Sequence, residues 1–223
     1  MAINEDTSIP LRHIFVAAKS GGGKSQTMRN VVVPKSGIRA VFWDPDKDHV
    51  CKHYTNKTLF LRALAAADKA KKPFRIGWAG DDSQETFLWF CEAVWRILDG
   101  KFDTWVIMEE LADLKLPQAV PKAYGRLLKR GRKYGAILVG NTQRIQEVPK
   151  TPVTGAAELW VGLHEDADAN YLEKMTGRAL TAAVISSLEP LNFYRRERGQ
   201  WEKIKVPYRK FGKSGGKRNQ FKT

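Results

Sequence analysis

The sequence has few cysteines, few acids for its number of bases, and no long apolar run. Cys51 and Cys91 are its two cysteines, and neither has CxxC spacing or a histidine-rich neighbourhood. This argues against a disulfide framework and a zinc site, and it favours a reducing compartment. No stretch approaches the roughly 18 apolar residues that a membrane-spanning helix needs. Residues 1–10 lack the apolar centre of a secretory signal. We therefore expect a soluble protein without a transmembrane segment of its own.

The shortage of acids leaves the chain strongly basic. Lys and Arg number 38 against 24 Asp and Glu, which gives a formal net charge of +14. An excess of this size favours a polyanionic partner such as nucleic acid or an anionic membrane surface. A basic protein without such a partner has the same composition, so charge alone does not decide. The length of 223 residues fits one medium domain.

Short apolar segments alternate with segments of helical periodicity. We expect strands at 13–18, 39–43, 74–78, 104–108, 136–139 and 158–163. Helices are expected at 24–30, 58–70, 82–98, 121–134, 166–175 and 180–187. A hairpin is expected between 191 and 206, with its turn at Arg198-Gly199. This alternation predicts an α/β fold with a mostly parallel central sheet flanked by helices.

Three parts of the chain differ in composition. Residues 1–11 form a short N-terminal extension, and residues 12–206 carry the alternating pattern of one domain. The stretch from Lys205 to Thr223 contains seven Lys or Arg residues and no acid. It has no periodicity, so residues 207–223 are predicted to be a flexible basic tail.

A glycine-rich loop joins the first expected strand to the first expected helix. The residues from Ala18 to Ser25 read Ala-Lys-Ser-Gly-Gly-Gly-Lys-Ser, a P-loop pattern with alanine at the usual first glycine. Such a loop turns successive backbone N–H groups toward phosphate oxygens, while its lysine reaches the terminal phosphates. Its last hydroxyl, on Ser25, binds Mg²⁺. The expected ATP-binding residues are Ser20, Gly21, Gly22, Gly23, Lys24, Ser25 and Gln26.

Two acids follow the most apolar strand. Glu109 and Glu110 come directly after residues 104–108, as in the second element of P-loop enzymes. We predict that Glu109 helps to hold Mg²⁺ and that Glu110 polarises the attacking water. The first acid is more usually aspartate. A pair of solvated acids that open a loop is the alternative interpretation. Asp44, after the second strand, either touches the same site or caps a turn.

Other polar side chains near the strand ends are candidates for supporting roles. Asn141-Thr142-Gln143 follow the fifth strand, and Gln143, with a donor and an acceptor, is the preferred γ-phosphate sensor. The basic helix before this strand offers Arg130 and Arg132 as an arginine finger that acts on a neighbouring subunit, with Arg126 in reserve. A solvated basic face is the alternative for that helix.

Taken together, these motifs resemble the FtsK–HerA superfamily of DNA-pumping ATPases. The resemblance rests on the phosphate loop, on Val-Phe-Trp-Asp-Pro-Asp-Lys, on Trp-Val-Ile-Met-Glu-Glu and on the Thr-Gln-Arg after the fifth strand. It spans roughly residues 12–206. The chain has room only for the motor, as in the genome-packaging ATPases of membrane-containing double jelly-roll phages of the tectivirus and corticovirus type. Ala18 and Glu109 depart from the family pattern.

The resemblance implies an ATP- and Mg²⁺-dependent ring, expected to be a homohexamer, that pumps double-stranded DNA into a preformed capsid. The chain would then occur in the host cytoplasm and at the packaging vertex of the virion, with capsid vertex or viral membrane proteins as further partners. DNA contacts are expected from Arg195, Arg196, Lys205, Arg209 and Lys210, although a solvated hairpin face is an equal alternative for the hairpin arginines.

Three other functions remain open at this stage. A P-loop nucleotide kinase has a similar size, but the second glutamate and the Thr-Gln-Arg element favour water as the acceptor. The assembly ATPases of filamentous phages are membrane-anchored, which this sequence does not predict. A non-hydrolysing, ATP-gated DNA-binding module would bind both ligands without turnover.

Overall fold

A computed structural model of the chain describes residues 9–210, which build an α/β domain around one sheet. Within these residues the sheet has nine strands in the order β3-β4-β2-β5-β6-β1-β7-β8-β9. The strands are β1 (Ile14–Ala17), β2 (Arg39–Trp43), β3 (Lys52–Tyr54), β4 (Phe74–Trp78), β5 (Thr104–Met108), β6 (Ala136–Thr142), β7 (Glu158–Val161), β8 (Asn192–Glu197) and β9 (Gln200–Lys205). The first seven pair in parallel, and the β8–β9 hairpin adds to β7 in antiparallel fashion. The predicted fold is confirmed.

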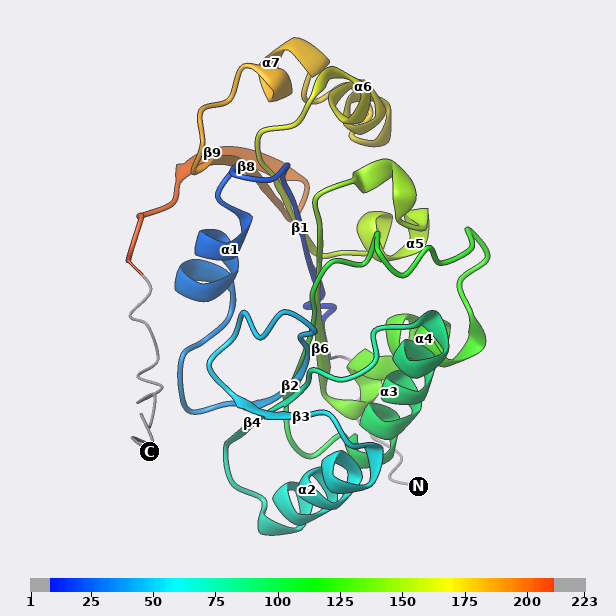
Figure 1. The fold of residues 1–223 in the computed structure, drawn as a ribbon. Coiled ribbons are helices and arrows are strands. Elements are labelled where there is room, and N and C mark those ends of the chain that lie inside the picture. Colours follow the sequence, from blue (N-terminus) through cyan, green and yellow to red (C-terminus); the bar gives the residue numbers. More distant parts are fainter. Residues whose placement is uncertain (1–8, 211–223) are drawn as a thin grey trace, which may run out of the picture.

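Helices cover both faces of this sheet. The α-helices are α1 (Lys24–Thr27), α2 (Lys57–Ala70), α3 (Gln84–Ile97), α4 (Lys122–Arg130), α5 (Lys150–Thr154), α6 (Asp166–Met175) and α7 (Ala182–Ser186). Figure 1 shows α2, α3 and α4 on one face and α1 on the other. The strands alternate accordingly. Val41 and Trp43 belong to the core under α2 and α3, whereas Ala40 and Phe42 belong to the core under α1.

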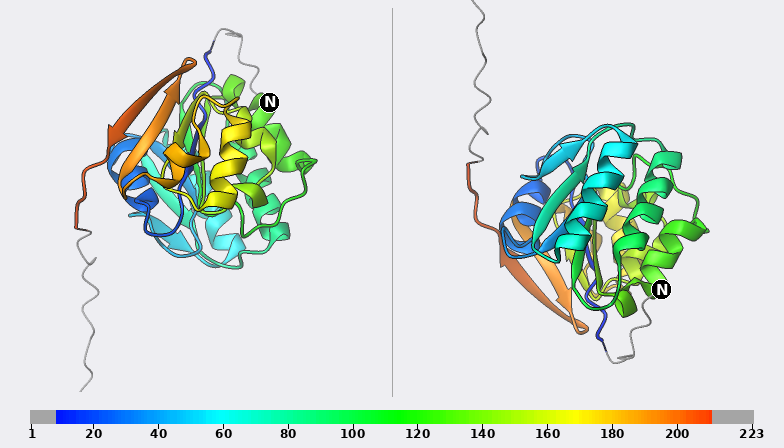
Figure 2. Two further views of the ribbon diagram at one scale, coloured as in Figure 1. Left: turned by 90° about the horizontal axis from the view of Figure 1, so that it is seen from above. Right: turned by 90° about the horizontal axis from the view of Figure 1, so that it is seen from below.

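The hairpin occupies one end of the sheet. Figure 2 shows the orange and red strands β8 and β9 extending away from the green helices α3 and α4. Phe193 of β8 is fully buried against Trp160 of β7, with ring centroids 6.1 Å apart. This contact fixes the first hairpin strand to the parallel part of the sheet. The predicted turn at Arg198-Gly199 lies between the two strands, and both residues have positive φ.

Several boundaries differ from the sequence-based expectations. The first helix is a single α-helical turn that continues as a π-helical turn, Met28–Val32. Strand β6 continues through Asn141 and Thr142, which we had expected beyond its end. The expected helix 121–134 ends as a 3₁₀ turn, Gly131–Tyr134. Strand β3, the 3₁₀ turn Ile145–Glu147 and helix α5 were not expected, because each is too short to show a period.

The ends of the chain reach only partly into the described residues. Residues 1–8 of the expected N-terminal extension and 211–223 of the expected tail lie outside them. The described part of the tail, residues 207–210, contacts the domain: the Arg209 backbone forms two hydrogen bonds with the Gln26 side chain. Across residues 9–210, no helix is long and apolar enough to cross a membrane.

Candidate nucleotide-binding site

The glycine-rich loop lies at the carboxyl end of β1, where ligands bind in parallel sheets. Gly21 and Gly23 have φ values of 76° and 102°, which side chains rarely permit. A Cβ atom on Gly23 would also lie 2.8 Å from Leu191 Cδ2. Glycine is therefore needed at Gly23 for both conformation and space. Helix α1 begins at the next residue and directs its N-terminus toward the loop.

The alanine at the usual first glycine fits without strain. Ala18 is fully buried, and its backbone N–H bonds to Thr142 of β6. Gly162 lies opposite: a Cβ atom there would be 2.9 Å from the Ala18 Cβ. The missing side chain at Gly162 thus leaves room for the Ala18 methyl group, and this departure from the common pattern leaves the loop intact.

The lysine of the loop contacts the second strand-end acid. The Lys24 ammonium forms an ion pair with the Glu110 carboxylate, and it donates a hydrogen bond of 3.2 Å to Asn141 Oδ1. Asn141 Oδ1 also accepts the Glu110 backbone N–H at 3.1 Å. Burial lowers the pKa of Lys24, and the negative charges of Glu109 and Asp48 partly oppose that shift. The Asn141 side chain therefore joins the ends of β1, β5 and β6 at one point.

The first strand-end acid is more deeply placed. Glu109 is 8% exposed; its Oε1 contacts His49 Nε2 at 2.5 Å and its Oε2 accepts from Asn141 Nδ2 at 2.5 Å. Burial raises the pKa of Glu109, but the hydrogen bonds from His49 and Asn141 and the charge of Lys24 outweigh it. The net pKa lies below the ordinary value. The carboxylate is thus charged at neutral pH and retains lone pairs for a further ligand.

Gln143 holds the second acid. Its backbone N–H donates to Glu110 Oε2 at 3.1 Å, and its side-chain Nε2 donates to Oε1 at 3.0 Å. Glu110 itself has a φ of 45°, in the left-handed region that non-glycine residues rarely adopt. The bonds from Gln143 and Asn141 hold that conformation. Strained backbone held by its surroundings is common where a side chain must be aimed at a ligand.

These groups surround a hollow of about 440 Å³. Its lining includes the residues predicted to bind ATP, apart from buried Gly22, together with Glu110 and Gln143. Glu109 lies behind this lining. Two acids of the segment after β2, Asp46 and Asp48, complete the wall. Asp44 precedes them and is fully buried.

The acids around the hollow suit a hard divalent cation. Burial raises the pKa of Asp48, the Arg29 guanidinium opposes this, and the carboxylates of Glu109 and Asp44 add to the rise. Three carboxylates, those of Asp44, Asp48 and Glu109, are therefore close enough to interact electrostatically. Carboxylates and a hydroxyl, here that of Ser25, are the oxygen donors that Mg²⁺ prefers. The donor set therefore fits Mg²⁺.

The outer wall of the hollow comes from the two segments that flank the hairpin. Pro190 and Leu191, before β8, and Tyr208, after β9, line it. Gln26 holds the second segment in place, because its Oε1 accepts from the Arg209 N–H at 3.0 Å and its Nε2 donates to the Arg209 carbonyl at 2.9 Å. Tyr208 is 66% exposed. An exposed aromatic ring thus stands beside the phosphate loop.

The finger candidates lie at the other end of the sheet. Arg130 ends α4 and is exposed, whereas Arg132 donates to the Ile9 carbonyl at 2.5 Å. Both precede β6, whose seven residues span about 23 Å at roughly 3.3 Å per residue. Neither side chain can reach the phosphate loop of its own chain. Arg126, the reserve, contacts Glu92 and Trp95.

The expected DNA-binding side chains fall into two groups. Arg195 forms ion pairs with Glu197 at 2.6 Å and Glu202 at 2.8 Å. Arg196 donates to a backbone carbonyl and lies over the Trp201 ring. Lys205, Arg209 and Lys210 are exposed. Lys205, Arg209 and Lys210 are therefore more accessible to DNA phosphates than Arg195 and Arg196 are.

Two residues, Asn141 and His49, contribute more to the site than their sequence positions indicate. Asn141 was noted but ranked below Gln143, because we expected it in a turn; its place inside β6 aims it at the loop lysine. His49 was not considered. No local pattern could have shown it, since its contact with Glu109 joins positions 60 residues apart. The Asp-rich run after β2 was the available signal for Asp46 and Asp48.

Comparison with known proteins agrees with this geometry. No family model matches the sequence. Protein P9 of Pseudoalteromonas phage PM2 is 33% identical over 165 residues, which cover 74% of each chain. The genome-packaging NTPase B204 of Sulfolobus turreted icosahedral virus 2, in complex with AMPPCP, superposes with a TM-score of 0.73 at 16% identity, over 90% of this chain and all of B204. VirB4 of Thermoanaerobacter pseudethanolicus gives a TM-score of 0.67 at 14% identity, over 88% and 90% of the two chains.

The fold is the P-loop α/β fold of these solved structures, with a glycine-rich phosphate loop after its first strand. The chain belongs to the family of protein P9 of phage PM2.

Proposed function

We propose that this protein hydrolyses ATP and uses the energy to move double-stranded DNA into a viral capsid. The observation that carries the proposal is the group at the carboxyl ends of β1, β5 and β6. There Lys24, Glu110, Asn141 and Gln143 meet beside a phosphate loop. A kinase needs a second substrate pocket beside the γ-phosphate, whereas this arrangement aims a fixed carboxylate at that position.

ATP binds with its phosphates on the loop from Ser20 to Ser25. Lys24 exchanges its contact with Glu110 for the terminal phosphates, which frees the Glu110 carboxylate. Ser25 and Glu109 would hold Mg²⁺, and the Asp48 carboxylate in the wall of the hollow would add negative charge beside it. When bound, Mg²⁺ supplies positive charge that neutralises the phosphate oxygens.

The base of ATP lies against the outer wall of the hollow. Tyr208 presents an exposed ring there, beside the apolar side chains of Pro190 and Leu191. Stacking on an aromatic ring is the usual way to hold a purine without reading its edges. Gln26 fixes the distance between this ring and the phosphate loop through its two hydrogen bonds to Arg209.

Hydrolysis uses Glu110 as the base. Its carboxylate is held by both nitrogen donors of Gln143, so Gln143 senses whether the acid has turned toward water or toward Lys24. Charge that develops on the γ-phosphate is met by an arginine of a neighbouring subunit. Arg130 and Arg132 are the candidates, and their position far from their own loop requires a ring, which we propose to be a hexamer.

The substrate on which the motor acts is double-stranded DNA. Support comes from the charge of +14, from the exposed Lys205, Arg209 and Lys210, and from the likeness to a genome-packaging NTPase. Phosphate contacts are independent of sequence, as a packaging motor requires. Arg195 and Arg196 contribute less, because neighbouring acids and carbonyls already engage them. Docking to a capsid vertex or viral membrane protein completes the proposal.

Steady-state ATP hydrolysis, with and without long double-stranded DNA, tests it. We expect DNA to stimulate the wild type, and Lys24→Ala and Glu110→Gln to abolish turnover. The exposed Lys69→Ala and Glu85→Gln variants, which change the same residue types elsewhere, should retain it. Binding of ATP and DNA without turnover at ring-forming concentrations would instead establish an ATP-gated binding module. Phosphorylation of a nucleoside monophosphate would establish a kinase.

A further inference from the structure

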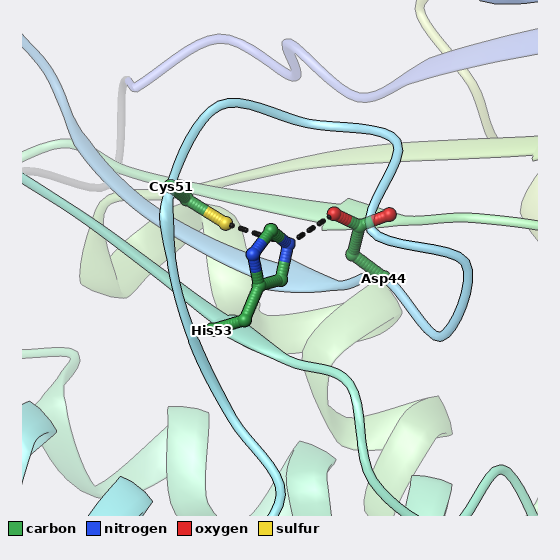
Figure 3. A group of neighbouring side chains, drawn as sticks. All are labelled: Asp44, Cys51 and His53. Carbon is green, nitrogen blue, oxygen red and sulfur yellow. Dashed lines mark hydrogen bonds and ion pairs between the residues drawn. The ribbon is translucent and has the colours of Figure 1, made fainter. Parts of the chain in front are cut away.

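Behind the nucleotide hollow, three potential metal ligands converge at the edge of the sheet. They are Asp44 directly after β2, Cys51 just before β3, and His53 within β3 (Figure 3). A carboxylate oxygen, the thiol sulfur and an imidazole nitrogen of these residues lie within 4.8 Å of one another. Asp44 is fully buried and the other two are half-buried. The ATPase mechanism proposed above uses neither Cys51 nor His53.

The His53 ring nitrogen faces both neighbours at once. Its Nε2 lies 2.7 Å from Asp44 Oδ2 and 3.2 Å from Cys51 Sγ. A protonated Nε2 can donate to the carboxylate but leaves the thiol with a poor partner. An unprotonated Nε2 can accept from the thiol but turns its lone pair toward a carboxylate oxygen. A proton on Nε2 therefore joins the imidazole to only one of its two neighbours at a time, whereas a cation can bind all three atoms.

The adjacent strand leaves space for the cluster. Gly77 of β4 pairs with His53, and a Cβ atom on Gly77 would lie 2.6 Å from Cys51 Sγ and 2.9 Å from His53 Cδ2. A glycine inside a strand weakens it, and it commonly marks a close approach of other groups. Here the approaching groups are the two candidate ligands themselves. The glycine provides an observation independent of the hydrogen bonds.

We infer that Asp44, Cys51 and His53 form a zinc site. Sulfur, imidazole nitrogen and carboxylate oxygen together are a typical Zn²⁺ ligand set, and a thiolate discriminates against Mg²⁺. Tetrahedral Zn²⁺ sets nitrogen and oxygen ligands roughly 3.4 Å apart and nitrogen and sulfur roughly 3.6 Å apart. To reach these values, the distance from His53 Nε2 to Asp44 Oδ2 must lengthen by roughly 0.7 Å, and that to Cys51 Sγ by roughly 0.4 Å.

Binding of the ion balances in charge and protons. The Cys51 thiol releases its proton to solvent, and the ion is bound by the thiolate, by an Asp44 carboxylate oxygen and by His53 Nε2, with the imidazole proton on Nδ1. The two negative charges then match Zn²⁺, and water supplies the fourth ligand. Burial and the Asp44 charge raise the pKa of the free Cys51 thiol to about 12, so this thiol does not act as a nucleophile by itself.

The site braces a segment that reaches the nucleotide hollow. The Asp44 carboxylate also accepts the backbone N–H groups of Asp48 at 2.7 Å and His49 at 3.0 Å. His49 in turn contacts Glu109, and Asp48 lines the hollow. An ion bound to Asp44 thus holds both ends of the segment from 44 to 53. Loss of the ion is expected to loosen the positions of His49 and Asp48.

Metal analysis and cobalt spectroscopy of the full chain test the inference. The protein is saturated with Mg²⁺ and ADP to occupy the nucleotide site, and Zn²⁺ is titrated against a chromophoric chelator. We expect one tightly bound Zn²⁺ per chain. Co²⁺ as a spectroscopic substitute should give a thiolate-to-metal charge-transfer band. Cys51→Ser should abolish the band and weaken Zn²⁺ binding at least about 100-fold, because even partners of ligands contribute 10- to 100-fold.

Two further variants keep the outcome decisive. Cys91→Ala removes the other free thiol, which lies in α3, and should leave both readouts unchanged. His53→Gln gives a second ligand variant in case Cys51→Ser folds poorly; circular dichroism checks this. The inference is overturned if the folded wild type binds no Zn²⁺, if the cobalt spectrum lacks a thiolate band, or if Zn²⁺ binding survives in both ligand variants. Because ATP hydrolysis is not the readout, this result is independent of the proposed function.

Discussion

Charged side chains at the carboxyl edge of the parallel strands and those on the β8–β9 hairpin are arranged in opposite ways. At the carboxyl edge, Lys24 and Glu109 are buried and hydrogen-bonded through Asn141. On the hairpin, Arg195 pairs with Glu197 and Glu202 at the surface. Buried charges are costly to leave unpaired, whereas exposed ion pairs contribute little. We therefore expect substitutions of Lys24, Glu109 or Asn141 to have large effects. Most substitutions of Arg195, Glu197 or Glu202 should have small effects.

The largest effect is expected from the two groups closest to the γ-phosphate. Glu110→Gln should lower kcat for ATP hydrolysis by at least about 100-fold, because positioned acid–base groups contribute 10²–10⁴-fold. Lys24→Ala should lower kcat/KM by at least about 100-fold, because it removes the positive charge from the terminal phosphates. Phosphate release measured in single turnovers separates chemistry from binding. Glu110→Gln should still bind ATP, while Lys24→Ala should not. If either variant hydrolysed ATP at the wild-type rate, the substituted residue would have no role in catalysis.

Asn141 tests whether the buried network behaves as one unit. Asn141→Ala removes one hydrogen bond from Glu109, leaves the Glu110 N–H without its acceptor, and leaves Lys24 with Glu110 as its remaining partner. It should lower the free energy of unfolding by about 2 kcal/mol, the usual cost of stranding a buried polar partner. Urea denaturation measures this. Gln200→Ala, a change of an exposed amide in the hairpin, is the control and should change stability by less than about 0.5 kcal/mol.

Glu109 and Glu158 should contribute to the pH dependence of stability with opposite signs. The pKa of Glu109 lies below its ordinary value, so its contribution to stability is present above the unfolded pKa of about 4.5 and is lost as pH falls through the folded pKa. The pKa of Glu158, in β7 beside the hairpin, is raised by burial, which the Trp160 hydrogen bond only partly offsets. Ionised Glu158 therefore costs stability as pH rises through its raised pKa.

Thermal unfolding from pH 3 to 8 can separate the two. Glu109→Gln should lower Tm at pH 7, with the deficit shrinking toward pH 3. Glu158→Gln should match or exceed the wild type at pH 7, with the difference vanishing in acid. Equal losses in both variants at pH 7 would contradict the contrast between the two regions.

A moderate effect is expected at the outer wall of the hollow. Tyr208→Ala should raise KM for ATP about 5- to 10-fold and leave kcat nearly unchanged, since base stacking contributes roughly 1–3 kcal/mol. Tyr208→Phe keeps the ring and should behave as wild type. A kcat decrease with unchanged KM would place Tyr208 outside the base site.

The smallest effect is expected on the hairpin. Arg195→Ala should change the free energy of unfolding by less than about 1 kcal/mol, because its acid partners are at the surface. DNA affinity should also change little, whereas the double change Arg209→Ala, Lys210→Ala should flatten the salt dependence of DNA binding. Fluorescence anisotropy with labelled duplex at several salt concentrations measures both. If Arg195→Ala lowered DNA affinity more than the double change does, Arg195 rather than Arg209 and Lys210 would be the DNA contact.

The sequence alone determined the order of elements and the location of the phosphate loop. These follow from local rules: apolar runs of strand length, helical periods and a glycine run before Lys24-Ser25 are all read within a few residues. The pair Glu109-Glu110 was predicted the same way, because it directly follows an apolar strand. The segments missed, such as β3 and α5, are too short for any period to show.

Tertiary structure alone decided which polar side chains meet. The neighbours of Glu109 are His49 and Asn141, which come from other strand ends and are brought together by the strand order β4-β2-β5-β6-β1. The same sheet order places Asp44, Cys51 and His53 around one point, although the cysteine spacing predicted no metal site. Contacts between strand ends depend on the order of strands in the sheet. That order is set by packing of whole elements, so no local sequence pattern can specify it.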